Sequence, residues 1–344
     1  MKQALWVWLT LALASGCGGD DEHDRDDGGA RTDEGGASRD DAGRRADAGS
    51  TVVDAGGFDA AATPRNDAGS TDMSRRDASA ARDASSTRDA QMSPSTRDGG
   101  VASGPSSGCG KSVSAGIGSF SKKTVRIGDR DRTYHVFVPE DYQATRRYPV
   151  VFRFHGNTGD GLAGGLGIED ATKKDTFIVG ADGLNRTWSP NNSNDLMLFD
   201  AMVAAVGEEY CVDLGKLFAY GFSAGAGFSE MLSCVRGDTL RGVAAVEGYD
   251  WGRGRTCEGP VAAWLLHDAT DRDAPIAGGR AARDRLLQQN GCSMETEPAG
   301  QDCVRYKGCS EGHPVVWCET SGRGHDIRGD YAPQEVWKFF SALP

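Results

Sequence analysis

The run Leu217-Phe218-Ala219-Tyr220-Gly221-Phe222-Ser223-Ala224-Gly225 decides the fold of this chain. Its first four residues are typical of a buried strand, and a stretch with a helical apolar pattern begins at Ser223. Gly-x-Ser-x-Gly between a strand and a helix is the pattern of a nucleophile elbow, a strained turn that lifts the serine hydroxyl out of the sheet. The pentapeptide alone can arise by chance in a chain with 48 glycines, but this context favours the elbow. Ser223 is therefore the candidate nucleophile.

Strands alternate with helices on both sides of this turn. Because β-branched runs are separated by helical stretches, the pattern predicts an α/β fold with a mostly parallel sheet and helices on both faces. An antiparallel hairpin should open it, since Asp129-Arg130-Asp131 separates two short β-type runs. The expected strands are 124–127, 133–138, 149–154, 177–179, 217–220, 243–246, 261–266 and 315–317, and the expected helices are 195–210, 223–234, 278–289 and 333–341.

A serine hydroxyl needs a base to take its proton, and in this kind of fold the chain order is serine, acid, histidine. Three histidines follow Ser223: His267, His313 and His325. His267 ends an apolar strand and His313 precedes another, so both fit structural roles. His325 lies in a glycine-rich loop between the last strand and the last helix, where a base can lean over the elbow. We expect His325 to be the base.

The acid should follow the strand 261–266, where Asp268, Asp271 and Asp273 stand close together. Spacing does not choose between them, and two of the three should be solvated loop carboxylates. The oxyanion of the reaction needs two preset backbone donors. One should be the amide of Ala224, directly after the nucleophile, and the other should come from the loop 155–159.

The N-terminal third of the chain has a very different composition. Residues 18–108 hold 19 acidic residues and 11 Arg but no Lys, Trp or Tyr and a single Phe. Such a segment cannot bury enough apolar surface to offset its ordering entropy, so we expect a disordered linker over 17–108 and a folded domain over 109–344. The net charge of the whole chain is −12 and neither part is basic, which gives nucleic-acid binding little support.

The first residues indicate export. Lys2 precedes the apolar run 4–14, and Ala14-Ser15-Gly16-Cys17 ends it, which is typical of a secretory signal peptide over 1–16. The small residues before Cys17 resemble a bacterial lipoprotein signal, which implies lipidation of Cys17 and attachment to a membrane facing the periplasm or the cell surface. An ordinary cleaved signal and free secretion are the alternative. The flexible run after Cys17 favours the anchor, since a tethered domain needs such a segment and a freely secreted one does not.

Eight further cysteines all lie in the predicted domain. An even number of cysteines in an exported chain favours disulfides, and the absence of Cys-x-x-Cys pairs argues against a metal site. Eight cysteines allow 105 connectivities, which spacing alone does not resolve. They are Cys109, Cys211, Cys234, Cys257, Cys292, Cys303, Cys309 and Cys318.

The domain resembles the secreted esterases of the polyhydroxybutyrate depolymerase, feruloyl esterase and acetylxylan esterase superfamily, and most closely the fungal-type feruloyl esterases. The stretches that carry the resemblance include 108–111, 148–152 leading to His155-Gly156, 211–213, 234–238, 275–280, 290–292 and 336–340. They cover essentially the whole domain and none of the linker.

This resemblance implies an α/β-hydrolase fold and a serine carboxylesterase that needs no metal or cofactor. It aligns Asp271 with the acid of the triad, while Asp268 replaces a usual glycine and stays a rival. It suggests Asn157 as the second amide donor and Trp188 as a substrate-binding aromatic, with packing of Trp188 in the core as the alternative. The implied disulfides are Cys109–Cys211, Cys234–Cys257 and Cys292–Cys309, with Cys303–Cys318 as an addition of this chain.

The expected activity is hydrolysis of feruloyl or related hydroxycinnamoyl esters on plant polysaccharide by a monomeric enzyme. Acetylxylan and polyhydroxyalkanoate esters are alternative substrates. An alternative hypothesis, in which the protein is not an enzyme, is a surface lipoprotein that keeps the fold and binds polysaccharide without catalysis. The intact set of Ser223, His325 and Asp271 argues against it.

Overall fold

The computed structural model describes residues 103–344, apart from 114–115, 163–165 and 173–174. The predicted signal peptide, the predicted lipidation site Cys17 and the predicted linker up to residue 102 lie outside the described residues. Among the described helices, none combines the length and apolar character that crossing a bilayer requires.

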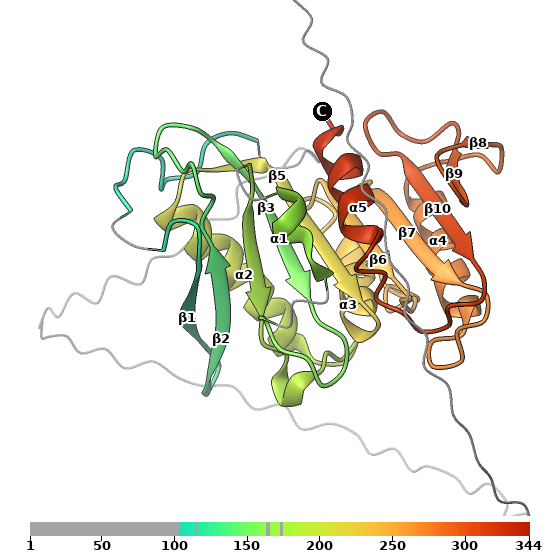
Figure 1. Cartoon of the computed structure of the whole chain (residues 1–344), viewed down its shortest axis with the longest axis horizontal. Helices are drawn as coiled ribbons and strands as arrows, with labels where there is room; N and C mark the ends of the chain where they lie inside the picture. The colour runs from blue at the N-terminus through green and yellow to red at the C-terminus, as the bar shows by residue number, and fades with distance from the viewer. Residues whose placement is uncertain (1–102, 114–115, 163–165, 173–174) are drawn as a thin grey trace, which may run out of the picture. The chain divides into compact units, whose positions relative to one another are not determined.

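The described residues form one sheet of ten strands in the order β1-β2-β4-β3-β5-β6-β7-β10-β9-β8 (Figure 1). The central strands from β4 to β10 pair in parallel, and the strands at both edges pair antiparallel. This confirms the mostly parallel α/β fold. The strands are β1 Phe120–Ile127, β2 Arg130–Phe137, β3 Tyr148–Phe154, β4 Phe177–Ala181, β5 Val212–Phe222, β6 Gly242–Val246, β7 Ala262–Asp268, β8 Thr296–Pro298, β9 Cys303–Tyr306 and β10 Val315–Thr320.

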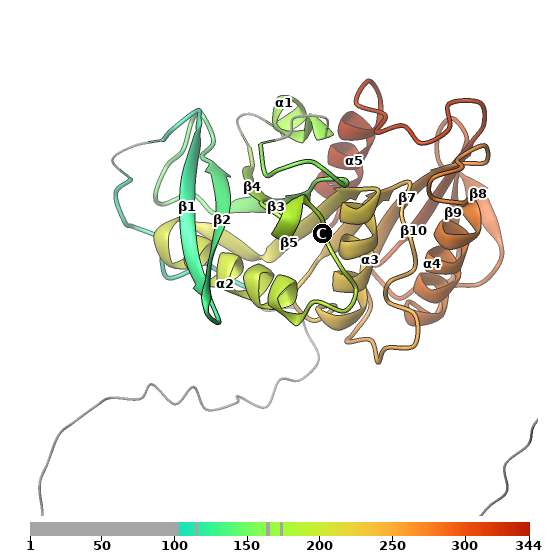
Figure 2. The same ribbon diagram turned by 90° about the horizontal axis from the view of Figure 1, so that it is seen from below.

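Helices cover both faces of this sheet, as Figure 2 shows. Side chains of α2, α3 and α4 share one hydrophobic cluster, and side chains of α1 and α5 share a second one on the opposite face. The two clusters take alternate residues of each strand: Ala219 of β5 belongs to the first, and its neighbours Phe218 and Tyr220 to the second. The helices are α1 Ile168–Thr172, α2 Ser193–Glu209, α3 Ala224–Val235, α4 Ile276–Gln289 and α5 Ala332–Ser341, with a 3₁₀ turn at η2 Leu184–Arg186.

Residues 103–108, which precede the predicted boundary at Cys109, pair with the domain. The Ser106 hydroxyl donates to the Tyr210 carbonyl at 2.6 Å and accepts the Val212 amide at 2.9 Å, and Pro105 pairs with Asp213. The composition of 103–108 is that of the linker, but its backbone adds to the start of β5. Because pairing of this kind uses backbone groups, composition does not reveal it.

Four disulfides staple the domain. They join Cys109 to Cys211, Cys234 to Cys257, Cys292 to Cys309 and Cys303 to Cys318. The last of these links β9 to β10, and so fixes the small antiparallel edge of β8 and β9, which the sequence pattern did not predict.

Candidate active site

Ser223 stands at a strained turn between β5 and α3. Its backbone has φ 55° and ψ −120°, a region that L-residues rarely adopt, and its amide donates to the Val246 carbonyl of β6 at 3.0 Å. Two glycines make the turn possible. A Cβ at Gly221 would lie 2.2 Å from the Gly225 carbonyl oxygen, and a Cβ at Gly225 would lie 2.1 Å from the Phe154 carbonyl oxygen. The strand and helix therefore approach as closely as a nucleophile elbow requires.

Three side chains from separate loops meet at this turn. His325 Nε2 lies 2.9 Å from Ser223 Oγ, and His325 Nδ1 lies 2.7 Å from Asp271 Oδ2. The Asp271 carboxylate can only accept, so Nδ1 carries the ring proton and Nε2 is free to accept the hydroxyl proton of Ser223. Ser223 and Asp271 are buried, while the His325 ring is part-exposed and so faces both the buried acid and the solvent side.

The Asp271 carboxylate is held from two sides. Its Oδ1 accepts the amides of Asp273 at 2.8 Å and Ala274 at 2.9 Å, and its Oδ2 faces His325. Burial by itself would raise the pKa of Asp271, but these hydrogen bonds outweigh it and lower the pKa below its ordinary value. The carboxylate is therefore ionised beside the imidazole.

Asp268 has a different environment from the one that its loop position suggested. It is fully buried, bound to Arg328 at 2.8 Å and to the Thr320 hydroxyl at 3.0 Å, and it accepts the Arg323 amide at 3.2 Å. Burial would raise the pKa of Asp268, but hydrogen bonds from the Thr270 hydroxyl and amide, the Arg323 amide and the Thr320 hydroxyl outweigh it and lower the pKa. The expectation that the Asp268 carboxylate is solvated is therefore wrong. Asp268 clamps the loop that carries His325, whereas Asp273 is exposed as expected.

The candidate second amide donor, Asn157, lies on the loop that follows β3. A Cβ at the neighbouring Gly156 would lie 3.4 Å from Ser223 Cβ, so this loop passes directly beside the nucleophile. The Asn157 side chain accepts a hydrogen bond from the Thr187 hydroxyl. Ala224, the other candidate, is the first residue of α3, where backbone N–H groups have no partner within the helix.

Trp188 and His155 hold this loop in place. Trp188 is 4% exposed, stacks on Phe228 at 4.9 Å and donates its indole N–H to the His155 carbonyl at 2.9 Å. Of the two roles expected for Trp188, its position fits packing in the core, where its ring lies. His155 accepts the Gly183 amide at Nε2 and donates from Nδ1 to the Gly156 carbonyl. Burial lowers the pKa of His155, which keeps it neutral in this role.

A buried polar cluster lies behind Asp271 and was not predicted. Glu247, His267 and Asp271 each bring one polar atom within 4.8 Å of the others. His267 Nε2 lies 2.7 Å from the Ala274 carbonyl, which can only accept, so this nitrogen carries a proton and is not a metal ligand. The cluster is better described as a hydrogen-bonded group than as a metal centre. The sequence gave no signal for this cluster, because Glu247 is simply a glutamate that directly follows a strand.

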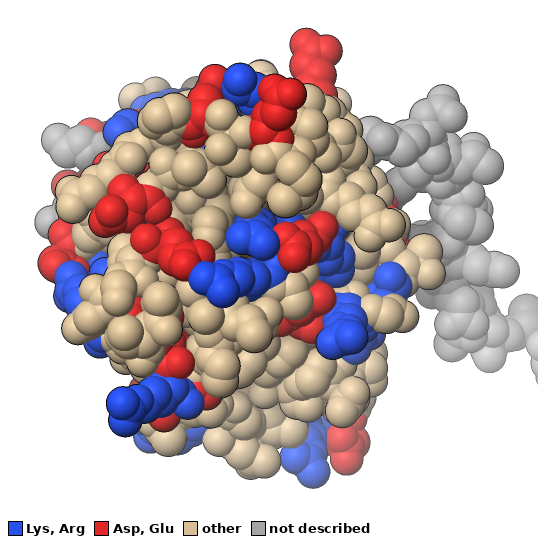
Figure 3. Space-filling view, turned by 90° about the vertical axis from the view of Figure 1, so that its right-hand side faces the viewer, with Lys and Arg blue, Asp and Glu red and all other residues tan. Residues whose placement is uncertain are grey.

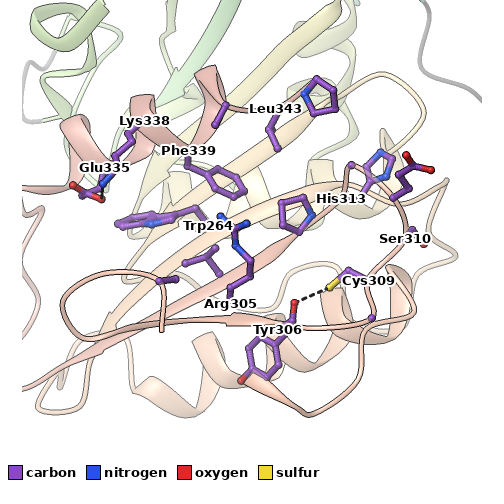
Figure 4. A pocket seen from close by; sticks show the side chains of 18 residues that line it. Trp264, Arg305, Tyr306, Cys309, Ser310, His313, Glu335, Lys338, Phe339 and Leu343 are labelled. Carbon is purple, nitrogen blue, oxygen red and sulfur yellow. Dashed lines mark hydrogen bonds and ion pairs between the residues drawn. The ribbon is translucent and has the colours of Figure 1, made fainter. Parts of the chain in front are cut away.

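Two surface features lie apart from the triad. A groove of about 510 Å³ between α5 and the β9–β10 edge has Trp264 and Phe339 at its floor and Arg305 and Lys338 at its rim (Figure 4), but no triad residue. His313 lines this groove and not the triad. On the face shown in Figure 3, acidic and basic side chains are interspersed without a broad basic surface.

Comparison with known proteins adds the family context. No family profile matches the chain. The chain is 32% identical over 268 residues to feruloyl esterase D of Neurospora crassa, covering 70% of this chain and 91% of that protein. It is 30% identical over 261 residues to feruloyl esterase C of Emericella nidulans, covering 69% and 91%. The crystal structure of a thermostable esterase shares the fold, with a TM-score of 0.50, 16% identity and coverage of 66% of this chain and 64% of that one.

Proposed function

The chain belongs to the feruloyl esterase family and is a carboxylic-ester hydrolase, and we propose that it releases feruloyl and related hydroxycinnamoyl groups from plant polysaccharide. The observation that carries this proposal is the hydrogen-bonded line from Asp271 through His325 to Ser223, at an elbow of the kind that esterases use.

Acylation begins at Ser223. Its Oγ attacks the ester carbonyl carbon while His325 Nε2 takes the hydroxyl proton, and Asp271 stabilises the resulting imidazolium without taking the proton itself. The carbonyl oxygen becomes an oxyanion, which the amides of Ala224 and Asn157 bind. Removing one such donor from a comparable site costs about 3 kcal/mol of transition-state stabilisation.

The tetrahedral intermediate then collapses. The bond from carbon to the sugar oxygen breaks, and that oxygen leaves with the proton held by His325 Nε2. A water enters, gives a proton to the same nitrogen and attacks the acyl group on Ser223, and the ferulic acid leaves as the Ser223 hydroxyl is restored. These steps use only this chain's side chains, its backbone amides and water, so the proposal includes no metal or cofactor and needs a single copy of the chain.

We further propose that residues 1–16 are a signal peptide, that Cys17 is lipidated and that 17–102 tether the esterase to a membrane facing the periplasm or the cell surface. Supporting this are the apolar run that ends at Cys17 and the polar composition that follows it. Two or more acyl chains give lasting attachment. A flexible chain of this length spans roughly 50 Å, enough to bring the domain to a polymer outside the membrane.

The acyl preference is tested by rates on methyl ferulate, acetylated xylan and polyhydroxybutyrate. We expect kcat/KM on methyl ferulate to exceed the others by about tenfold or more, the discrimination that a few extra apolar contacts in the transition state supply. Ser223→Ala is the control and should lose activity on all three by several orders of magnitude. A higher kcat/KM on acetylated xylan or polyhydroxybutyrate would reassign the substrate.

The three neighbouring aspartates form a matched series. Asp271→Asn should keep the fold but lower kcat on the order of 10⁴-fold, as in another triad, because His325 loses its tautomer preference. Asp268→Asn should lower the free energy of unfolding by roughly 3 kcal/mol, because the buried Arg328 loses its ionised partner. Asp273→Asn, exposed on the same loop, should change neither by much.

Urea unfolding and steady-state kinetics on each variant separate the two effects. A crippled but stable Asp268→Asn enzyme beside an active Asp271→Asn enzyme would show that the acid assignment is wrong.

The anchor is tested by Cys17→Ala. We expect this variant to appear as active enzyme in the soluble fraction, or as an uncleaved precursor, and to incorporate no labelled palmitate. Ser50→Ala, in the predicted linker, should behave like the unaltered protein. A Cys17→Ala protein that stays in the membrane fraction with unchanged mobility would overturn the lipoprotein assignment.

A further inference from the structure

Glu247 lies directly behind the triad. It follows the last residue of β6 with a positive φ of 53°, a conformation that is strained for a residue with a side chain, and it is fully buried. Its amide donates to the Leu266 carbonyl at 2.9 Å. Both of its carboxyl oxygens lie within 3.2 Å of the Asp268 amide, at 3.2 and 3.0 Å. A large acidic side chain is thus fixed in the interior at a backbone position where glycine would be easier.

The Glu247 carboxyl shares this interior with the acid of the triad. Glu247, His267 and Asp271 bring polar atoms within 4.8 Å of one another, and His267 Nε2 lies 3.3 Å from Glu247 Oε2. Arg328 is bonded to Asp268, at 2.8 Å. The carboxyl groups of Glu247 and Asp271 therefore meet in a buried site. The nearby guanidinium of Arg328 is already bound to a third carboxyl group, that of Asp268.

Two buried carboxyl groups this close do not both ionise, because the second charge is opposed by the first and by desolvation. Asp271 is the one better suited to keep its charge, since it accepts two amides and faces the His325 ring. Burial, together with the hydrogen bond and charge of Asp271, raises the pKa of Glu247 to about 8, and hydrogen bonds from the Ala274 amide, His325 and Glu247 lower the pKa of Asp271. At neutral pH, the single proton of this pair of carboxyl groups is accordingly bound to Glu247.

We propose that Glu247 is a positioning residue of the esterase, which retains a carboxylic-acid proton and donates it as a hydrogen bond to Asp271, so holding Asp271 against His325. This inference rests on the proposed function of the triad. Glu247 touches no reacting atom; it acts through Asp271, which orients His325, which in turn activates Ser223. The buried line is thus one residue longer than a triad.

The arrangement has a consequence for pH. When Glu247 loses its proton, two carboxylates face each other, the hydrogen bond to Asp271 is lost, and the orientation of His325 weakens. Turnover should therefore fall as the pH rises through about 8. The same proton is bound by the folded and not the unfolded chain between the ordinary glutamate pKa and about 8, so the free energy of unfolding should also decrease as pH rises across this window.

Of the other titratable groups around Glu247, Glu230 is the one that could also lose a proton in this range. His267 and Asp268 face it from β7, and the pKa of each is lowered, His267 by burial and Asp268 by its hydrogen bonds. Arg328 approaches from the loop before α5, and Tyr249, two residues on, has its pKa raised by burial. From α3, Glu230 lies against the position of Gly248, and burial raises its pKa well above the ordinary value. Glu230 is therefore the control.

The test compares Glu247→Gln, Glu247→Ala and Glu230→Gln with the unaltered enzyme, measuring kcat and KM on p-nitrophenyl acetate from about pH 6 to 9.5. Glu247→Gln keeps a neutral donor that does not ionise, so it should stay active and lose the fall in kcat near pH 8. Glu247→Ala removes the donor and should lower kcat about tenfold at every pH with little change in KM, the effect typical of a lost supporting partner. Glu230→Gln should keep the fall near pH 8.

Several results would overturn the inference. These are a fall in kcat near pH 8 that persists in Glu247→Gln, or a loss of kcat in Glu247→Gln as large as in Glu247→Ala. If Glu247→Gln does not fold, the infrared carbonyl band of a protonated carboxylic acid is measured in Glu230→Gln instead. The band should be present at neutral pH and disappear through pH 8, and its absence at neutral pH contradicts the inference. Full activity in Ser223→Ala would overturn the proposed function itself. If Ser223→Ala is inactive, as expected, but the Glu247 variants keep the kcat and pH profile of the unaltered enzyme, only this inference is overturned.

Discussion

The close approach of strand β5, helix α3 and strand β3 at Gly221 and Gly225 is the constraint on which the rest of the site depends. Neither position has room for a Cβ, because carbonyl oxygens of the elbow and of β3 lie within 2.2 Å of where it would stand. This contact forces Ser223 into a positive φ, and the amide bond to Val246 of the next strand holds it there. The parallel sheet then contributes what the elbow needs, since all its central strands end at the same edge and their loops converge on the serine.

Buried polar groups hold those loops in place. The loop after β7 carries Asp271, and the loop after β10 carries His325; the ion pair between Asp268 and Arg328 joins them. The loop after β6 adds Glu247, and the loop after β3 is held by His155 and Trp188. Breaking one partner of such a group is costly because the remaining partner stays buried without it. The same interactions that hold the domain together therefore set the orientation of the imidazole.

Local patterns in the sequence predicted those parts of the fold and site that depend on neighbouring residues. The elbow at Ser223 and the alternation of strands and helices are of this kind, and so is the glycine-rich loop of His325. The choice of Asp271 over Asp268 came from the family resemblance, because the partner that buries Asp268 lies 60 residues away at Arg328. The sequence did not decide between two positions for Trp188, because a tryptophan near a site gives the same pattern whether it faces the substrate or the core. Glu247 gave no signal, since a glutamate after a strand is ordinarily solvated and its burial follows from the packing of three loops.

The central claim, that His325 and Asp271 activate Ser223 as the nucleophile, is tested most directly by covalent labelling. The protein is treated with a fluorophosphonate, digested and mapped by mass spectrometry, with His325→Ala alongside. We expect one labelled peptide, modified at Ser223, and labelling that is strongly slowed in His325→Ala because the hydroxyl keeps its proton. An unlabelled protein would favour a domain that binds polysaccharide without catalysis. A label on another serine, or equal labelling of Ser223 without His325, would show that Ser223 is not a nucleophile activated by His325.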